Sequence, residues 1–428
     1  MWGTNGGVYL GYGTDRTEGE PPASAPVIQY AGDRHVMSIG PAGCGIGRRL
    51  LQPNILALGN WSMVVVDTTG EMAALCARRR DPELTQTIVL DPFGVSGLPG
   101  QGFDPVAALD PESPEFPDDA LDLAETLIRP DGSARDLVTA LIMYARLSGS
   151  GLPGVRACLG SFSGVADRLA VAAEESDWPE LAVKSAACAD GDVSCALTQT
   201  RWLDSRAIKD GLVHAPVDFG MLRETPTTVF LVLPARRLAT HAAWLRVVIA
   251  SVLQALMRDA GPPKVPVMLL LDQYPALARG GFPILETNLP ALAAHGVKLW
   301  TVWQDLAQAK TLYGDGFESF VSGCGVLQAF APQDVVTAEY LSQRTGLTAV
   351  ELEARSRTVN LGPGMSAQSH GGTVSYQPVP RMLPQDLRNM QEGFSVIFSH
   401  KVRNTIRAFM PLPAAAPARR RGFFGGRG

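Results

Sequence analysis

A short stretch near the N-terminus, residues 35–58, constrains the fold of this chain more than any other feature. The mainly apolar residues 36–39 lead into the glycine-rich loop Gly40-Pro41-Ala42-Gly43-Cys44-Gly45-Ile46-Gly47, and helical spacing follows from Arg48. A strand, a glycine-rich turn and a helix in this order are typical of a phosphate-binding loop, GxxxxGK[ST], in which backbone N–H groups face a polyphosphate. The stretch therefore predicts an α/β domain with a nucleotide site at residues 40–48.

The loop lacks the residues that would give such a site its charge. Gly40 and Gly45 occupy the two glycine positions, but Ile46 replaces the lysine and Gly47 replaces the Ser/Thr that binds magnesium. No lysine occurs before Lys184, so a shift of one or two residues does not restore it. The sequence predicts the shape of a nucleotide site without its main cation.

Composition excludes some classes of protein. A length of 428 residues predicts two or three domains, and the net charge of −5 argues against a generally basic surface while leaving a local basic channel open. The six cysteines are scattered without a CxxC pair, which gives no support to a zinc or redox site. Without a signal peptide or a continuous apolar run of about 18–20 residues, the chain is expected to be cytoplasmic, with no transmembrane segment.

Strand-like and helix-like segments alternate through much of the chain. Asp67, Asp91 and Asp272 each follow a run rich in β-branched or aliphatic residues. Further strands are predicted at 227–233, 297–303, 325–330 and 395–399, and a long helix at 242–257. This alternation predicts a doubly wound sheet, whose ligands bind at the carboxyl ends of the strands.

The pattern changes between residues 118 and 211, where apolar residues recur only at helical spacing. We therefore expect five segments. They are an N-terminal edge ribbon (1–30), the first part of a nucleotide-binding domain (31–117), an all-α inserted domain (118–211), the second part of the nucleotide-binding domain (212–410) and a disordered basic tail (411–428).

The order of motifs resembles the coupling proteins of type IV secretion systems, the TraG/TraD-type conjugative DNA-transfer ATPases. The motifs are GPAGCGIG, VVVDTTGEM, LDPFG, GFDP, TTVFLVLP, VMLLLDQYPALA, WQDLAQAKTLYGD and VPRMLPQDL, spread from about Gly7 to Leu412. The resemblance implies a RecA-like P-loop NTPase domain interrupted by an all-α domain. It also implies membrane-anchored, often hexameric motors that bring a relaxase–DNA complex or protein substrates to a secretion channel.

The resemblance also assigns roles to single residues. Asp272 matches the aspartate that binds Mg²⁺, and Gln273 stands where the family has a catalytic glutamate. Gln304 matches a glutamine near the γ-phosphate, with a polar cap of the next helix as the alternative. Arg344 is a candidate arginine finger acting on a neighbouring subunit, with a solvated arginine at a helix end as the alternative.

Three groups of residues have competing interpretations. Arg48 and Arg49 either replace the missing lysine or point away from the phosphates, and the second is preferred. Asp67 and Glu71 follow the second strand of the family, and a helix N-cap arrangement of Thr68/Thr69 and Glu71 explains this motif without any chemistry. The arginines of the tail, Arg419–Arg421 and Arg427, either keep the chain soluble or contact nucleic acid or anionic lipid.

The predicted function is that of a coupling-protein homologue with a weakened or absent ATPase, which recruits DNA–protein or protein substrates to a type IV secretion or conjugation channel. ATP and Mg²⁺ are its expected ligands, and DNA and further copies of the chain are expected partners. Attachment to the inner membrane is expected to go through partners. The alternative is an active hexameric DNA-translocating ATPase that has rebuilt its site.

Overall fold

The structure is a computed structural model of the 428-residue chain. It describes residues 6–16, 18–80, 82–129, 132–161, 164–179, 181, 190–212, 217–258, 261–362 and 365–413, without the side chains of 165 and 353–373. Most of the predicted disordered tail, residues 414–428, lies outside the described residues, whereas 411–413 lie within them.

Most of the strands form one sheet. The strands are β1 (Val8–Gly13), β2 (Val27–Tyr30), β3 (His35–Ile39), β4 (Ser62–Asp67), β5 (Gln86–Leu90), β6 (Thr227–Val232), β7 (Val267–Leu271), β8 (Val297–Trp303), β9 (Cys324–Ala329), β10 (Leu347–Gly362), β11 (Met365–Pro380), β12 (Phe394–Ser399) and β13 (Val402–Phe409). The sheet has 11 strands in the order β2-β1-β13-β12-β9-β3-β8-β7-β4-β6-β5. From β9 to β5 neighbouring strands are parallel, and from β2 to β9 they are antiparallel. The result is a parallel core with an antiparallel edge that includes the predicted N-terminal ribbon.

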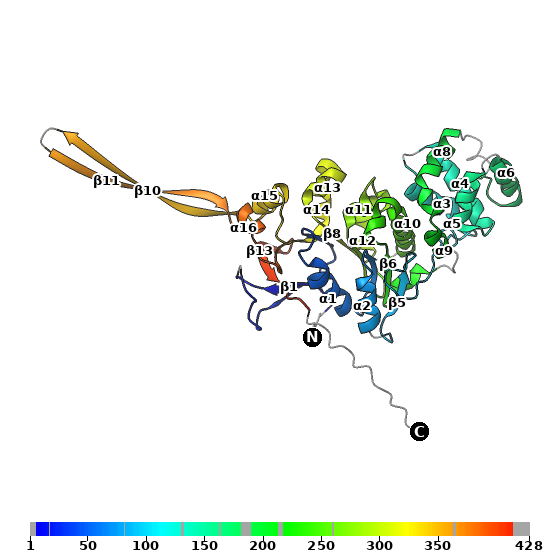
Figure 1. Ribbon diagram of the computed structural model, residues 1–428, viewed down its shortest axis with the longest axis horizontal. Coiled ribbons are helices and arrows are strands. Elements are labelled where there is room, and N and C mark those ends of the chain that lie inside the picture. The colour runs from blue at the N-terminus through cyan, green and yellow to red at the C-terminus, as the bar shows by residue number, and fades with distance from the viewer. Residues whose placement is uncertain are drawn as a thin grey trace, which may run out of the picture.

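Helices cover both faces of the sheet (Figure 1). The helical elements are η1 (Gly47–Leu51), α1 (Gln52–Ala57), α2 (Glu71–Arg79), α3 (Phe116–Leu127), α4 (Ser133–Leu147), α5 (Gly151–Gly160), α6 (Val165–Glu175), α8 (Asp190–Gln199), η3 (Arg201–Asp204), α9 (Arg206–Gly211), η4 (Phe219–Arg223), η5 (Ala235–Arg237), α10 (Leu238–Met257), α11 (Tyr274–Ala278), α12 (Pro283–Ala294), α13 (Leu306–Tyr313), η6 (Gly314–Gly316), α14 (Phe317–Gly323), α15 (Val335–Arg344) and α16 (Pro384–Arg388). In β4, Val64 and Val66 join the apolar cluster under α10–α14, while Met63 and Val65 join the cluster under α1 and α2. Because successive side chains of a strand point to opposite faces, a continuous apolar run fits a strand that is buried on both sides.

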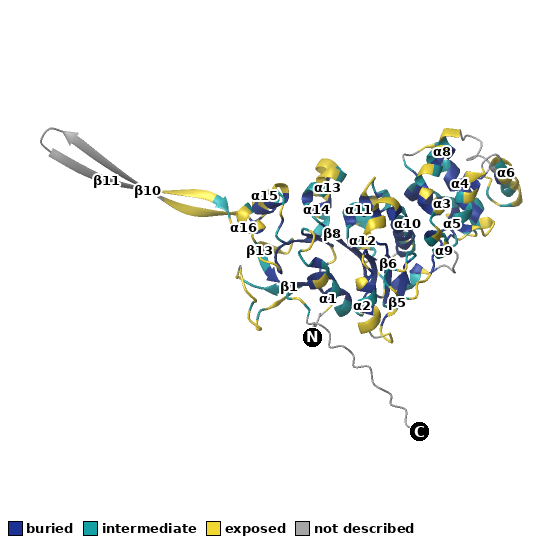
Figure 2. Cartoon of the chain, in the orientation of Figure 1, coloured by how far each residue is buried: buried dark blue, intermediate teal, exposed yellow. Residues whose placement is uncertain are grey.

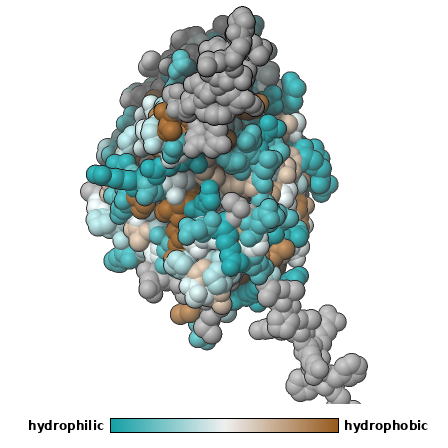
Figure 3. Space-filling view, turned by 90° about the vertical axis from the view of Figure 1, so that its left-hand side faces the viewer, coloured by the Kyte–Doolittle hydropathy of each residue, from teal (hydrophilic) through white to brown (hydrophobic). Residues whose placement is uncertain are grey.

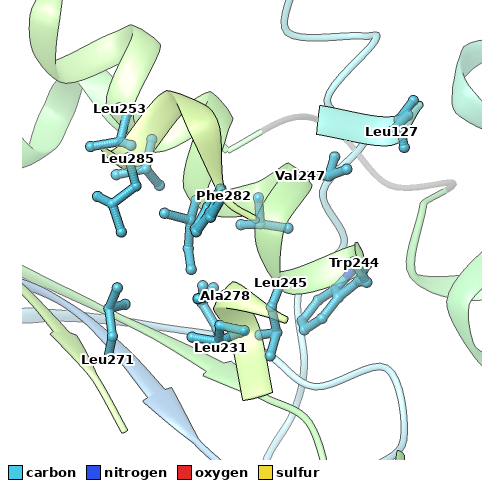
Figure 4. Close-up of a cluster of buried hydrophobic side chains, with 14 of the residues drawn as sticks. Leu127, Leu231, Trp244, Leu245, Val247, Leu253, Leu271, Ala278, Phe282 and Leu285 are labelled. Carbon is cyan, nitrogen blue, oxygen red and sulfur yellow. The ribbon is translucent and has the colours of Figure 1, made fainter. Parts of the chain in front are cut away.

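The long helix α10 connects the sheet to the helical region. Figure 4 shows Leu245 of this helix near Leu231 of β6 and Ala278 of α11, and Val247 on the side toward Leu127 of α3. The segment Ala235–Met257 is also long and apolar enough to cross a membrane by length and composition, and 67% of its most apolar window is buried inside the fold. The expectation of no transmembrane segment stays a prediction, because a buried core helix also satisfies a test of length and composition. The packing of α10 is that of a core helix.

The residues between 118 and 211 that the structure describes form helices, with no strand among them. Figure 1 shows α3, α4, α5 and α8 grouped beyond β5, at one end of the sheet. This arrangement agrees with a helical insertion in a doubly wound α/β fold. The limits drawn at residues 118 and 211 stay a prediction.

A long hairpin, β10–β11, was missed by the sequence analysis. Its strands pair from Leu347↔Pro380 to Gly362↔Met365 and form a sheet of their own. The hairpin projects from the end of the molecule opposite the helical insertion, and its described side chains near the base are mostly exposed (Figures 1 and 2). Figure 3 views this end face and shows hydrophobic residues between hydrophilic ones.

Candidate functional site

The glycine-rich loop connects β3 to η1 at the carboxyl end of the parallel strands. Gly43 and Gly45 have φ values of 83° and 85°, a region that glycine enters without the steric penalty of a Cβ atom. The Gly40 N–H donates to the carbonyl oxygen of Trp303 at 2.9 Å, which fixes the start of the loop to the end of β8. The helix after the loop begins with a π-helical turn, Gly47–Leu51, rather than with α-helix at Arg48.

A cavity of about 490 Å³ opens beside this loop. Its walls come from the loop, from the ends of β7 and β8, and from the C-terminal part of the chain. The lining residues are Gly40, Pro41, Ala42, Gly43, Cys44, Gly45, Ile46, Gly47, Arg48, Asp272, Gln273, Val302, Trp303, Gln304, Glu392 and Leu412. The structure thus brings together every predicted site residue except Arg344.

Ile46, at the lysine position, belongs to the hydrophobic core. Its side chain is 6% exposed and lies in the apolar cluster under α1 and α2. A Cβ atom built on Gly40 would come within 2.9 Å of the Ile46 Cδ1 and 3.0 Å of the Phe330 Cβ. Only glycine fits at position 40, and the side chain at position 46 is packed close to the start of the loop.

The two arginines after the loop differ in their surroundings. Arg48 is exposed, and its Nη2 lies 3.9 Å from a carboxylate oxygen of Glu71 on α2. Arg49 is buried and donates from Nη1 to the carbonyl oxygen of Met410 at 2.9 Å and from Nη2 to Glu392 at 2.8 Å. Arg49 is therefore committed to the C-terminal part of the chain, which agrees with the preferred interpretation that it points away from the phosphates.

Asp272 ends β7 on the opposite side of the cavity. Burial raises the pKa of its carboxyl to about 6, the N–H of Gln273 opposes that shift, and the negative charge of Asp67 adds to it. The carboxylate accepts the Gln273 N–H at 2.9 Å. Among the described residues no group of three His, Cys, Asp or Glu could hold a metal by itself. Asp272 alone suits Mg²⁺ only if the phosphates supply other ligands, as they do in many nucleotide sites.

Gln273 has a left-handed backbone, with a φ of 56°. This conformation is unfavourable for residues with a side chain, and it occurs where a functional site imposes it. Its side chain is an amide, so it cannot take a proton from an attacking water as a glutamate would.

Gln304 follows β8 and faces the same cavity. Its backbone N–H donates to the side-chain oxygen of Gln308 at 3.3 Å, and its own side-chain oxygen accepts from the Gln308 Nε2 at 3.3 Å. Asp305 caps α13 by accepting the backbone N–H of Gln308 at 2.8 Å. The cap is therefore made by Asp305, and the helix does not require Gln304 for it. Trp303 and Tyr274, the neighbours of the two cavity glutamines, have ring centroids 5.0 Å apart in the core.

Asp67 has a structural role. Its carboxylate accepts the N–H groups of Thr69, Gly70 and Ala73 at 2.8–3.0 Å and so caps the start of α2. Glu71 lies in the first turn of that helix and faces Arg48. The prediction placed the N-cap on Thr68/Thr69 and Glu71. In the structure Thr69 Oγ1 accepts the Glu71 N–H at 3.2 Å, but the main acceptor is Asp67, which the prediction did not include.

Arg344 is not part of the cavity. Its guanidinium donates to the Tyr340 hydroxyl at 2.9 Å and lies over the rings of Tyr340 and Phe398, at 5.5 and 5.8 Å. The residue is exposed at the end of α15. Within one chain Arg344 is thus an exposed arginine at a helix end, as the alternative interpretation describes it.

Four lining residues, Val302, Trp303, Glu392 and Leu412, were missed by the sequence analysis. Trp303 could have been found, because it directly precedes Gln304 at a strand end. Glu392 and Leu412 carried no usable signal, since they reach the cavity only through the pairing of β12 and β13 with the rest of the sheet.

The backbone of the cavity has the shape that a nucleotide needs, but the charges of its lining residues suit a nucleotide less well. The loop has the backbone of a phosphate cradle, and a Cβ built on Gly43 or Gly47 would meet nothing within 4 Å. Against this, the lining residues comprise one cation, Arg48, and two acids, Asp272 and Glu392. The site can accept a phosphate group with Mg²⁺ on Asp272, but it lacks the lysine and the base that hydrolysis normally uses.

Comparison with known proteins gives a consistent result. Residues 5–150 and 191–408 match the family model described as type IV secretory system conjugative DNA transfer. The conjugal transfer protein TraG of Rhizobium radiobacter is 28% identical over 370 residues, which cover 79% of this chain and 56% of the relative. A conjugal transfer protein TraG of Escherichia coli is 25% identical over 427 residues, 88% of this chain and 64% of the relative. The chain thus spans little more than half the length of the first of these relatives.

Solved structures share the fold. The plasmid coupling protein TrwB in complex with ADP and Mg²⁺ has a TM-score of 0.60 at 17% identity, covering 90% of this chain and 86% of that one. VirB4 of Thermoanaerobacter pseudethanolicus has a TM-score of 0.55 at 13% identity, covering 96% of this chain and 98% of that one. The predicted α/β fold class and the predicted family resemblance are both confirmed.

Proposed function

Because this chain belongs to the type IV secretory system conjugative DNA transfer family, we propose that it is a coupling protein with a weakened ATPase. It recruits DNA–protein or protein substrates to the channel of a type IV secretion or conjugation system. One observation carries the proposal of a weak ATPase. The cavity keeps the glycine loop, Asp272 and Gln304, but has an apolar side chain at position 46 and an amide at position 273.

The two replaced groups act on different parts of the reaction. A lysine at position 46 would stabilise charge on the β- and γ-phosphates, and a glutamate at 273 would help to deprotonate water. Removing a single preorganised electrostatic group from an active site typically costs about 3–4 kcal/mol of transition-state stabilisation. The loss of both groups supports little turnover of any nucleotide that the cavity binds.

ATP with Mg²⁺ is the proposed ligand of the cavity. Backbone N–H groups of residues 43–47 would bind phosphate oxygens, and Asp272 would hold the metal with further ligands from the phosphates. The metal supplies charge neutralisation at the phosphates. Since the pKa of Asp272 is about 6 without it, the carboxylate is largely ionised and able to bind Mg²⁺ at pH 7 and above.

The proposed partners are the channel proteins of the secretion system, a relaxase–DNA complex or protein substrates, DNA itself, and further copies of the chain in a hexamer. The proposed location is the cytoplasm, at the inner membrane through these partners. The support is family membership together with the similarity to TraG proteins over most of the chain.

A second candidate function is an active hexameric DNA-translocating ATPase. It is favoured by the placement of Asp272 and Gln304 on the same cavity as an intact glycine loop. In that case another residue, such as Arg48 or an arginine of a neighbouring subunit, would replace the missing lysine.

ATP hydrolysis by the purified chain separates these functions. We expect turnover far below 1 s⁻¹, with or without single-stranded DNA, whereas turnover near about 1 s⁻¹ or above, within the usual enzyme range, would support the motor. Recruitment is tested separately, by deleting the gene and measuring plasmid transfer and the association of the relaxase with the channel. Normal transfer in the deletion strain would contradict a role in recruitment.

A further inference from the structure

The nucleotide cavity has two ends, on opposite sides of β3. Asp272 and Gln304 directly follow β7 and β8, which lie on one side of β3 in the sheet. Glu392 precedes β12 and Leu412 follows β13, and these two strands lie on the other side. Because β12 is antiparallel to β9 and β13 is antiparallel to β12, the start of β12 and the end of β13 lie at the edge where the parallel strands end. The glycine loop, which follows β3, therefore lies between the two pairs of residues.

The residues at the two ends suit different parts of a nucleotide. In P-loop NTPases the magnesium-binding carboxylate and the residue that orients water act at the β- and γ-phosphates. Asp272 and Gln304 are the candidates for these roles, so a nucleotide held by the loop has its terminal phosphates toward β7 and β8. Its ribose and base then extend toward Glu392 and Leu412.

The phosphate end of the cavity offers little positive charge. The side chain of Ile46 is 6% exposed and packs in the core, where a P-loop lysine would reach the β- and γ-phosphates. Among the described residues that line the cavity, Arg48 is the one cation, and its side chain is 68% exposed and lies 3.9 Å from Glu71. Since the contribution of a lysine is missing, contacts with the nucleoside account for a larger share of the binding free energy.

Glu392 presents a fixed carboxylate at the other end. Its side chain is 64% exposed, and its Oε1 accepts a hydrogen bond from the Nη2 of the buried Arg49 at 2.8 Å. This ion pair holds the carboxylate in place and balances its charge, which limits its repulsion of nearby phosphates. A carboxylate has about four acceptor positions, so Glu392 retains acceptors for hydroxyl groups. Carboxylates at the ends of parallel strands bind ribose hydroxyls in this way in dinucleotide-binding folds.

Leu412 adds an apolar surface beside this carboxylate. Its side chain is 56% exposed and lines the cavity. The carbonyl oxygen of Met410 accepts a hydrogen bond from the Arg49 Nη1 at 2.9 Å, so one guanidinium positions both Glu392 and the segment that carries Leu412. Small-molecule sites combine apolar walls with a few polar groups that fix the orientation of the ligand. A carboxylate next to an apolar side chain suits a ribose and the flat face of its base.

We propose that the cavity recognises the nucleoside end of its nucleotide, with Glu392 accepting hydrogen bonds from the ribose hydroxyls and Leu412 packing on the base. The inference rests on the proposed nucleotide site and deepens it, because it assigns the specificity of that site. The cavity then distinguishes a ribonucleotide from its dideoxy form and from inorganic polyphosphate, whereas the number of phosphates has a small effect.

The first experiment measures, by calorimetry with Mg²⁺, the affinity of the full chain for ATP and for 2′,3′-dideoxy-ATP, which lacks both ribose hydroxyls. The parent is expected to bind ATP more tightly by about tenfold or more, the usual value of a hydrogen bond to a charged group. Glu392→Ala should bind the two nucleotides within about twofold of each other. Because both affinities are measured on one protein, a general loss of stability does not change their ratio, and an unfolding curve shows that the variant is folded.

Glu224→Ala is the matched control for this substitution. Glu224 is also an exposed glutamate paired with a cation, Lys264, but it is not among the described residues that line the cavity. The control variant should keep the preference of the parent for ATP over the dideoxy nucleotide.

The second experiment uses ligands that lack one end of the nucleotide and a variant that changes the other wall. ADP should bind within about threefold of ATP, and inorganic tripolyphosphate with Mg²⁺ should bind about thirtyfold more weakly or worse, because the phosphate end has no lysine. Leu412→Ala should weaken the binding of ATP and of dideoxy-ATP by the same factor, about threefold or more, because this side chain meets the base and not the ribose.

Four results would overturn the inference and leave the nucleotide site standing. They are equal binding of ATP and dideoxy-ATP by the parent, a preference for ATP that survives Glu392→Ala in the folded chain, tripolyphosphate binding as tight as that of ATP, and an unchanged ATP affinity of Leu412→Ala. A parent that binds no nucleotide would overturn the inference together with the proposed ATP ligand. Recruitment is independent of all these results, since it is measured by plasmid transfer.

Discussion

Arg49 and Met410 are 361 residues apart in the sequence and are joined by a 2.9 Å hydrogen bond from the guanidinium Nη1 to the carbonyl oxygen. The second nitrogen of the same guanidinium binds Glu392. One buried side chain thus connects the helix that follows the glycine loop to the last part of the described chain. The charge of Arg49 therefore fixes the last part of the described chain and is not available to a ligand.

Arg49→Ala is expected to lower the free energy of unfolding by about 2–4 kcal/mol, because it leaves a buried carbonyl oxygen without its charged donor and removes the packed stem. Chemical denaturation measures the change. Arg48→Ala is the adjacent control, and its 68% exposed side chain should contribute less than about 0.5 kcal/mol. Equal effects of the two substitutions would mean that the link to Met410 contributes no stability.

Restoring both missing charges is expected to increase ATP hydrolysis by more than the two single changes combined. Ile46→Lys returns a cation but no base, and Gln273→Glu adds a carboxylate near the phosphates with no lysine to balance it. Turnover and ATP affinity of both single variants and the double variant give the answer. Since Ile46 is buried, unfolding curves must accompany the assay, and a folded double variant without activity would show that the loop has also lost its geometry.

The cavity residues at the ends of β7 and β8 were predictable, whereas Glu392 and Leu412 on the C-terminal side of the cavity were not. Asp272 and Gln304 could be assigned because long buried runs, β7 and β8, end directly before a polar residue. Glu392 and Leu412 could not, because they reach the cavity only through the pairing of β12 and β13 with the rest of the sheet. The packing of Ile46 into the core also goes beyond the sequence, which shows only that the lysine is missing.

The hairpin β10–β11 was missed for a different reason. Residues 350–353 alternate apolar and acidic side chains, and Pro363-Gly364 separates the two paired strands, so a turn signal was present in the sequence. The hairpin lacks the buried apolar run that predicts a strand of the central sheet, because its described side chains are mostly exposed. The hairpin has no core beneath it, and its side chains near the base, Leu347 and Tyr376, are 63% and 69% exposed.

Asp272→Asn is expected to stabilise the fold above about pH 6 and to have no such effect near pH 4. The pKa of Asp272 is about 6 when folded and 3.8 when free, so the folded chain binds the proton more tightly. Ionisation therefore costs stability as the pH rises from about 4 to 6, by up to about 1–3 kcal/mol, and the asparagine avoids that cost. Urea unfolding of parent and variant at pH 8 and pH 4 should give a difference at pH 8 that vanishes at pH 4. An equal difference in the free energy of unfolding at pH 8 and at pH 4 would contradict this prediction.

Gln273→Gly is expected to leave the chain at least as stable as the parent, because glycine adopts a φ of 56° without penalty. Gln273→Ala is the matched control, since it removes the amide but keeps the Cβ atom. The glycine variant should exceed the alanine variant by about 1 kcal/mol in free energy of unfolding. If alanine is the more stable of the two, the left-handed backbone carries no strain.

Removal of most of the hairpin should leave the rest of the fold intact. Replacing residues 349–378 by a two-residue Asn-Gly turn keeps the base, where Arg381 N–H donates to the Gly346 carbonyl oxygen. Since β10 and β11 pair only with each other among the described strands, the free energy of unfolding should change by less than about 0.5 kcal/mol. A larger loss would indicate that the hairpin supports the sheet.

The neighbours of β3 have a consequence for how the protein is made. β3 pairs with β8 and β9, and the Gly40 N–H at the start of the loop binds the Trp303 carbonyl oxygen. The partners of this strand and of the start of the loop are therefore encoded more than 250 residues later. At 5–20 residues per second a ribosome takes roughly 15–60 s to add the residues between the loop and the end of β9. Over that time the first strand emerges without either partner, and a chain that stops early exposes a bare strand edge instead of a partial site. We expect nascent chains of this protein to depend on chaperones until the last third of the sequence has been synthesised.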